Sequence, residues 1–150
     1  MIEFLDLPDP LGFLDIKSIK LKENTWIGNK EIYGIYDCED ELTGWLKLLF
    51  PECNQFKYQT LKDGIPRHID VNRTMNYNYI LQAGGSNVET VWWDNGKELY
   101  RTCLPEKKWH KFNAGIEHSI ENIETERIGI TVFKYDTSAG WWYYSDEPPG

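Results

Sequence analysis

A histidine and an aspartate two positions apart, in His68-Ile69-Asp70, are the residues of this 150-residue sequence best placed to do chemistry. On a β-strand, residues i and i+2 point to the same face, so the imidazole and the carboxylate would project into the same space. Two such groups can act as adjacent ligands of one metal ion. A third ligand from a strand across the fold would complete one face of an octahedron. Two histidines and one carboxylate, with three positions left open, are a typical ligand set for non-haem Fe(II).

By itself, a His-x-Asp sequence is also typical of a solvent-facing polar pair on a strand. The metal interpretation therefore depends on the elements that surround these residues. Between Asn54 and Tyr135 the sequence consists of short runs rich in β-branched and aromatic residues, separated by Gly, Asn, Asp and Pro. Eight such runs occupy residues 56–61, 65–71, 75–83, 87–93, 98–104, 109–114, 118–123 and 127–135.

Eight short strands at this spacing predict a β-sandwich or barrel. The break at Asp94-Asn95-Gly96 predicts a tight hairpin between two of them. No long helical pattern lies between the runs, which argues against a parallel α/β sheet. We expect Tyr77, Tyr79 and Leu81 to share one strand face and to belong to the core.

The first 54 residues are expected to support this β-region. Residues 40–50 have apolar residues at near-helical spacing and are followed by Pro51, which predicts a helix lying against a sheet. Residues 16–21 form a short apolar-polar stretch. We therefore predict one domain over residues 1–150, with a supporting segment (1–54), a β-core (55–135) and a C-terminal tail (136–150), of which Trp141 to Tyr144 could dock elsewhere.

Composition excludes several classes of function. The formal net charge of −8 is unfavourable for binding nucleic acid or an anionic membrane surface, since both need Lys and Arg. No apolar run is long enough to span a bilayer, and the acidic N-terminal sequence does not resemble a signal peptide. The cysteines, Cys38, Cys53 and Cys103, have no metal-binding spacing, so we expect free thiols in a cytoplasmic protein.

Two further features belong to a recognisable pattern. His118 opens the seventh run, within Gly115–Asn122, and Arg127 follows nine residues later at the start of the eighth. With His68 and Asp70 on the second run, the sequence resembles the Fe(II)/2-oxoglutarate-dependent oxygenases. It is most similar to their aspartyl/asparaginyl β-hydroxylase-like branch, in which an Arg follows the His-x-Asp pair, as Arg73 does here, and an Asn follows the distal His. The resemblance implies a mainly β fold, the double-stranded β-helix or cupin-like jelly roll.

The resemblance also implies roles for individual residues. His68, Asp70 and His118 would bind Fe(II) and form the catalytic centre, and Arg127 would bind the C5 carboxylate of 2-oxoglutarate through its planar guanidinium. The family often has Ser two residues after this Arg, where this sequence has Gly129, so Thr131 on the same strand face could supply the hydroxyl. Asn78 or Tyr79 could also contact 2-oxoglutarate. Arg73 and Trp92 are candidates for binding substrate.

The implied reaction consumes O₂ and 2-oxoglutarate, releases succinate and CO₂, and hydroxylates a small-molecule or peptidyl substrate. Two other functions remain open. Gly115–Asn122 also fits a cupin motif, which would make the chain a metal-dependent cupin enzyme that has no need of Arg127. The many Trp and Tyr residues would also suit a non-enzymatic carbohydrate-binding β-sandwich.

Two residues have ordinary structural interpretations beside these. Arg127 could form a surface ion pair with Glu124 or Glu126. His110, close to three lysines in the sequence, is expected at the surface or at a sheet edge.

Overall fold

The computed structural model describes residues 2–13, 33–70 and 73–135. Its β-strands are β1 (Ile2–Phe4), β2 (Tyr33–Asp37), β3 (Gln55–Leu61), β4 (Ile65–His68), β5 (Met75–Gln82), β6 (Glu89–Asp94), β7 (Lys97–Thr102), β8 (Trp109–Asn113), β9 (His118–Glu121) and β10 (Arg127–Phe133). The helices of this part are α1 (Asp40–Leu49) and the 3-10 helix η1 (Pro10–Phe13). The mainly β prediction and the predicted helix are confirmed. The expectations for residues 16–21 and 136–150 lie outside the described residues.

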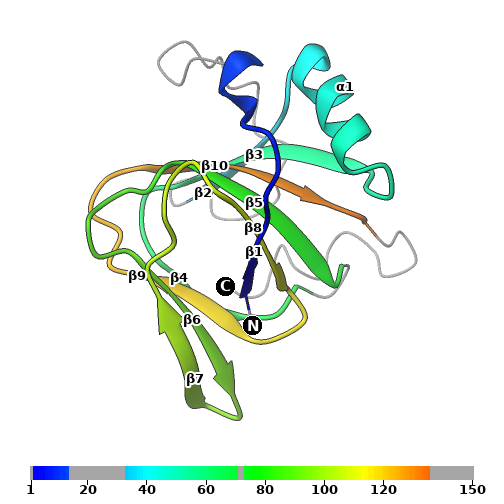
Figure 1. The fold of residues 1–150 in the computed structure, drawn as a ribbon. Helices are drawn as coiled ribbons and strands as arrows, with labels where there is room; N and C mark the ends of the chain where they lie inside the picture. Colours follow the sequence, from blue (N-terminus) through cyan, green and yellow to red (C-terminus); the bar gives the residue numbers. More distant parts are fainter. Residues whose placement is uncertain (1, 14–32, 71–72, 136–150) are drawn as a thin grey trace.

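The strands form two antiparallel sheets that face each other (Figure 1). The six-stranded sheet, here called sheet A, has the order β1-β8-β5-β10-β3-β2, and the four-stranded sheet B has the order β4-β9-β6-β7. From β3 to β10 the chain passes back and forth between them, since β3, β5, β8 and β10 belong to sheet A and the strands between them to sheet B. All eight predicted strands are present. Strands β1 and β2, in the segment predicted only as support, extend sheet A at its two edges.

Helix α1 covers the outer face of sheet A, on the side away from sheet B (Figure 1). Acidic residues in its first turn and Lys47 in its last turn suit the helix dipole. Leu42 and Leu46, four residues apart, lie on the same side of the helix and are buried. The helix ends where the amide of Phe50 donates to the Leu46 carbonyl at 2.8 Å, just before Pro51.

The largest apolar cluster lies between α1 and sheet A. Its strand residues alternate along the sheet, as Phe56 and Tyr58 do on β3, and Ile130 and Val132 on β10. Tyr79 and Leu81 of β5 belong to the cluster and Tyr77 packs against it, as predicted. The residues between them in sequence point to the inner face, toward sheet B.

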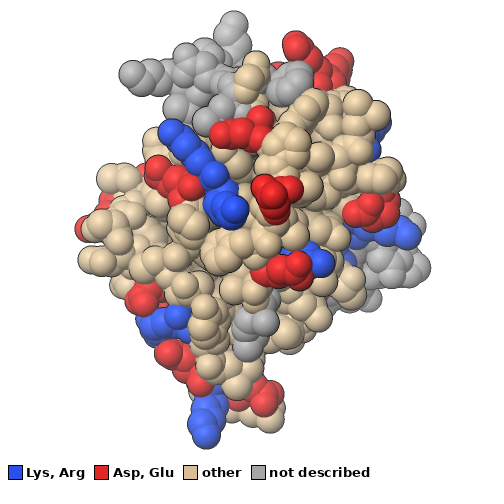
Figure 2. Space-filling view, viewed as in Figure 1, with Lys and Arg blue, Asp and Glu red and all other residues tan. Residues whose placement is uncertain are grey.

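The tight hairpin predicted at Asn95-Gly96 joins β6 to β7 and projects from the molecule (Figure 1). Both residues have positive φ, 49° and 78°, as the turn type favoured in two-residue hairpins requires. Acidic and basic side chains are interspersed on the face shown in Figure 2. No helix within the described ranges has the length and apolar character needed to cross a membrane.

Candidate metal centre

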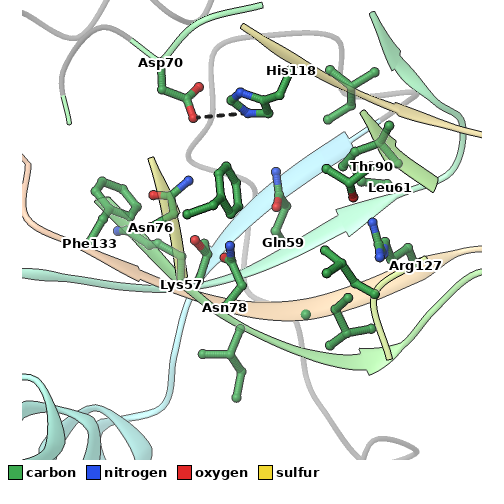
Figure 3. Close-up of a pocket in the computed structure, with 18 of the residues that line it drawn as sticks. Lys57, Gln59, Leu61, Asp70, Asn76, Asn78, Thr90, His118, Arg127 and Phe133 are labelled. Carbon is green, nitrogen blue, oxygen red and sulfur yellow. Dashed lines mark ion pairs between the residues drawn. The ribbon is translucent and has the colours of Figure 1, made fainter. Parts of the chain in front are cut away.

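A cavity of about 140 Å³ lies between the two sheets. The inner faces of β3, β5, β8 and β10 form one wall, and residues of β4, β6 and β9 form the other. A cavity of about 150 Å³ in another protein accommodates benzene, so this one is large enough for a small organic molecule. Figure 3 shows 18 of the residues that line it.

His68, Asp70 and His118 meet at one end of this cavity. His68 is the last residue of β4 and is the cross-strand partner of His118, the first residue of β9. The Asp70 carboxylate lies 3.7 Å from Nε2 of His68 and 3.8 Å from Nε2 of His118. One ligand atom from each of the three residues lies within 4.8 Å of the others. Asp70 follows the end of the strand rather than lying on it, and its amide donates to the Ala114 carbonyl at 3.0 Å.

Backbone hydrogen bonds orient both imidazoles. Nδ1 of His68 lies 2.8 Å from the Pro66 carbonyl oxygen, and Nδ1 of His118 lies 2.7 Å from that of Ile116. Each Nδ1–H donates to a carbonyl, so the Nε2 atom of each ring lies on the side of Asp70. Burial lowers the pKa of His118 despite the neighbouring Asp70, which favours the neutral, metal-binding form.

Asp70 is kept charged by its surroundings. Burial would raise the pKa of its carboxyl group, but the positive charge of Arg73, the two histidines and a hydrogen bond from Asn76 together hold it below its ordinary value. Arg73 is itself held in place, with its guanidinium carbon 3.5 Å from the centre of the Phe133 ring. Two imidazoles and one carboxylate, converging at the end of a cavity, fit a divalent first-row metal such as Fe(II).

Arg127 lies at the far end of the same cavity from Asp70 and His118 (Figure 3). Arg127 is only 6% exposed, and its Nε and Nη2 atoms have no hydrogen-bond partner among the residues that the structure describes. Burial lowers its pKa to about 10. Within residues 2–13, 33–70 and 73–135 no carboxylate forms an ion pair with it, so the alternative of a surface pair with Glu124 or Glu126 is wrong. A buried cation without a counter-ion, facing a cavity, suits an anionic ligand.

Two of the residues predicted to contact 2-oxoglutarate, Asn78 and Thr131, are cross-strand partners on β5 and β10 and both line the cavity. Tyr79 also borders it, but its ring packs on Trp109, with the ring centres 5.2 Å apart, and its hydroxyl donates to the Asp9 carboxylate. The hydroxyl of Tyr79 is therefore engaged outside the cavity.

The structure gives a reason for glycine at position 129, where the family that the sequence resembles often has serine. A Cβ atom at Gly129 would lie 3.2 Å from the Tyr79 carbonyl oxygen, at an irregularity in the pairing of β10 with β5. Gly129 thus allows the close approach of these two strands, beyond leaving space in the cavity.

Of the two residues predicted to contact substrate, Arg73 lines the cavity and Trp92 does not. Trp92 is fully buried in a separate cluster, with its ring centre 5.7 Å from that of Phe112. Phe112 in turn packs against His118 at 5.2 Å. This position corrects the prediction for Trp92. It is the cross-strand partner of His118 and lies in the core behind that residue.

Sequence reasoning missed several lining residues, of which His110 is the clearest. It is 1% exposed and lines the cavity, so the expectation of a surface histidine is wrong. Its strand, β8, lies between β1 and β5, and both of its faces are covered. One signal was available in the sequence. His110 and Phe112 are two residues apart on a strand and so share a face, which places His110 beside an apolar residue. Lys57, Gln59 and Thr90 also line the cavity.

Comparisons with known proteins agree with this architecture. No protein-family model matches the sequence, and no curated protein matches it. Among solved structures, an oxidoreductase of the 2OG-Fe(II) oxygenase family from Burkholderia pseudomallei is 11% identical, with a TM-score of 0.59 over 80% of this chain and 73% of that one. A prolyl hydroxylase from Trichoplax adhaerens, in complex with a peptide fragment of hypoxia inducible factor, is 14% identical, with a TM-score of 0.57 over 75% of this chain and 66% of that one.

A mutant of oxalate decarboxylase from Bacillus subtilis has a similar fold as well. It is 15% identical, with a TM-score of 0.51 over 77% of this chain and only 28% of that one. At such identities the likeness concerns the fold alone. This fold is shared by oxygenases of the 2OG-Fe(II) family and by a decarboxylase.

Proposed function

We propose that this chain is an Fe(II)- and 2-oxoglutarate-dependent dioxygenase that hydroxylates a small-molecule or peptidyl substrate. The observation that carries the proposal is one cavity with the His68, Asp70 and His118 cluster at one end and the unpaired, buried Arg127 at the other. The passage of the chain between two facing sheets supports a double-stranded β-helix, or jelly roll, in one domain over residues 1–150. The aspartyl/asparaginyl hydroxylase-like branch and a cytoplasmic location stay predictions.

Different residues of the cavity would bind the metal and 2-oxoglutarate. His68, Asp70 and His118 would hold Fe(II), and bound Fe(II) would supply O₂ activation as 2-oxoglutarate is oxidised to succinate and CO₂. Arg127 would bind the distal carboxylate of 2-oxoglutarate bidentately, and Asn78 and Thr131 lie on the sheet face between the two ends. Arg127, Thr131 and His118 are at most 6% exposed, and charge interactions in such a buried environment are stronger than in water.

The substrate would approach from the metal end, where Arg73 lines the cavity. The structural neighbour from Trichoplax adhaerens is bound to a peptide fragment, so a peptidyl substrate is compatible with this fold. The formal charge of −8 makes nucleic acid an unsuitable substrate.

Anaerobic addition of Fe(II) and 2-oxoglutarate, followed by O₂, tests the proposal. We expect a weak visible charge-transfer band before O₂ is added, and succinate, detected by NMR, after it. His118→Ala should abolish both, whereas Asp63→Asn, in an exposed turn, should leave both unchanged. Absence of the band and of succinate in a protein that retains its metal would refute the dioxygenase proposal.

A metal-dependent cupin enzyme that does not use 2-oxoglutarate is the second candidate, favoured by the fold similarity to oxalate decarboxylase. It predicts metal binding with no effect of 2-oxoglutarate and no requirement for Arg127. A carbohydrate-binding module is the third candidate. It predicts sugar binding on exposed aromatic residues such as Tyr100, with no metal retained.

A further inference from the structure

Positive charge predominates in the cavity between the sheets. Apart from the histidines, the charged side chains among the described residues that line it are the cations Lys57, Arg73 and Arg127 and the single anion Asp70. This local excess contrasts with the formal net charge of −8 for the whole chain. A cleft lined by charges of one sign attracts ligands of the opposite sign, so the cavity favours anions.

Two of these three cations already have a partner or a proposed ligand. Against the effect of burial, the positive charge of Arg73 lowers the pKa of the Asp70 carboxyl group, so these two charges offset each other. Arg127 would be occupied by the distal carboxylate of 2-oxoglutarate. Lys57 has neither role, although it lines the same cavity.

Lys57 lies on β3, between β10 and the edge strand β2. Its cross-strand partners are Thr131 of β10 on one side and Asp37 of β2 on the other. Thr131 is two residues from Phe133, which lies at the metal end of the cavity (Figure 3). Arg127 is four residues from Thr131 in the other direction, roughly 13 Å along the strand. Figure 3 shows the side chains of Lys57 and Arg127 apart, with Lys57 toward the metal end.

The ion pair of Lys57 joins the cavity to the surface. The Nζ atom of Lys57 donates to Oδ1 of Asp37. The Lys57 side chain is 15% exposed and that of Asp37 is 52% exposed, so the lysine lines the cavity while its partner faces solvent. An ammonium group has three donors, and Asp37 accepts the one hydrogen bond that Lys57 makes among the described residues. Ion pairs with an exposed carboxylate contribute little to stability, so Asp37 is an exchangeable partner.

Resting on the proposed function, we propose that the substrate is a small carboxylic acid and that its carboxylate binds Lys57 in place of Asp37. The substrate carboxylate would accept the hydrogen bond that Asp37 accepts in the free protein, and the Asp37 carboxylate would be hydrated instead. Because Lys57 is paired across the strands with Thr131, which is expected to contact 2-oxoglutarate, the acid would lie beside the cosubstrate and near the metal end.

The balance of charge in the loaded cavity favours an acid over a neutral or cationic substrate. Asp70 is the one carboxylate among the described lining residues, and Arg73 offsets it. The charges of a divalent metal and of Arg127 exceed those of the two carboxylates of 2-oxoglutarate by one. A carboxylate on the substrate would cancel this excess, whereas a cationic substrate would increase it.

Two substitutions that break the same ion pair separate binding from a structural role. Lys57→Met removes the proposed binding group, so it should raise the Kd of the acid roughly tenfold or more. Asp37→Asn removes the competing carboxylate and keeps Lys57, so it should leave this Kd unchanged or lower it by up to about fivefold. Lys111→Met is the matched control, because Lys111 also pairs with an exposed carboxylate, that of Glu3 at 3.5 Å, but does not line the cavity.

Binding can be measured by NMR on the full chain loaded with Mn(II) and 2-oxoglutarate, since Mn(II) broadens the proton signals of a ligand bound close to it. The probes are the common amino acids and short monocarboxylic acids, each compared with its amide, which has nearly the same shape and lacks the negative charge. We expect at least one acid to bind, with a Kd roughly tenfold or more below that of its amide.

The outcomes separate this inference from the proposed function. If the Mn(II) form binds no 2-oxoglutarate by calorimetry, the dioxygenase proposal fails, and the acid site is judged by the same criteria on the Mn(II) form alone. The inference is overturned if no acid binds, if amides bind as tightly as acids, or if Lys57→Met and Asp37→Asn weaken acid binding equally. It is also overturned if Lys57→Met has no more effect than Lys111→Met, or if it weakens binding of 2-oxoglutarate as much as binding of the acid.

Discussion

Replacing Arg127 with methionine should make the metal-free protein more stable while it impairs ligand binding. The drop in the pKa of Arg127 from the usual 12.5 to about 10 corresponds to about 3 kcal/mol, at 1.36 kcal/mol per pKa unit. Because the depressed pKa belongs to a base, this cost is fully present at neutral pH and is relieved only as the pH rises through about 10. Methionine keeps an apolar stem in the same space and removes the charge.

We therefore expect Arg127→Met to raise the free energy of unfolding by about 1–3 kcal/mol, and Tm by about 3 °C for each kcal/mol. Urea unfolding of the metal-free protein measures the first quantity. Affinity for 2-oxoglutarate, measured by calorimetry on the Mn(II) form, should fall by roughly a hundredfold or more, the cost of losing one partner of a buried charge pair.

Arg101 provides the matched control. Its guanidinium already contacts Glu98 at 2.7 Å, Glu89 at 2.9 Å and Glu121 at 3.1 Å, at the surface of sheet B. Arg101→Met should leave stability unchanged or lower it only slightly, because ion pairs at the surface contribute little. If Arg127→Met destabilises the metal-free protein as much as Arg101→Met does, the guanidinium of Arg127 is satisfied in the free protein and the reasoning is wrong.

Three further predictions concern stability. Gly129→Ser should cost about 1–2 kcal/mol in urea unfolding, because its Cβ would lie 3.2 Å from the Tyr79 carbonyl oxygen; unchanged stability would show that the strands can separate. Leu46→Ala, at a position with 0% exposure, should cost about 2–5 kcal/mol, whereas Leu48→Ala, at 84% exposure, should change stability by about 0.5 kcal/mol at most. The pKa of His110 is about 4 in the folded protein and 6.5 when unfolded, so the free energy of unfolding falls as the pH drops from 6.5 to 4. His110→Gln should reduce this loss by up to about 3 kcal/mol. Equal slopes of unfolding free energy against pH in the two proteins would contradict the prediction.

Much of the fold could be predicted because the signals are local. Alternating residues and turn residues such as Asn95-Gly96 define the strands from β3 to β10. Strands β1 and β2 were not predictable in this way. Three residues at Ile2–Phe4 and five at Tyr33–Asp37 carry too little pattern, and their pairing with β8 and β3 makes them strands.

The candidate site was partly predictable for a related reason. His68 and Asp70 are two residues apart, so their proximity is a local property, and the later His118 and Arg127 follow the spacing of a known pattern. The position of His110 depends on which strands flank β8, which the sequence does not state locally. The place of Trp92 depends in the same way on the pairing of β6 with β9.

Sheet A keeps its main apolar cluster on one face and its ligand cavity on the other. Neighbouring residues along a single strand therefore have different roles. On β3, Tyr58 packs in the apolar cluster and Gln59 lines the cavity. Because the main apolar cluster lies on the outer face, we expect exchange of inner-face residues such as Gln59 and Asn78 to cost less stability than exchange of cluster residues. The same scaffold could thus diverge toward new substrates, and a library restricted to inner-face positions is the natural starting point for redesigning its selectivity.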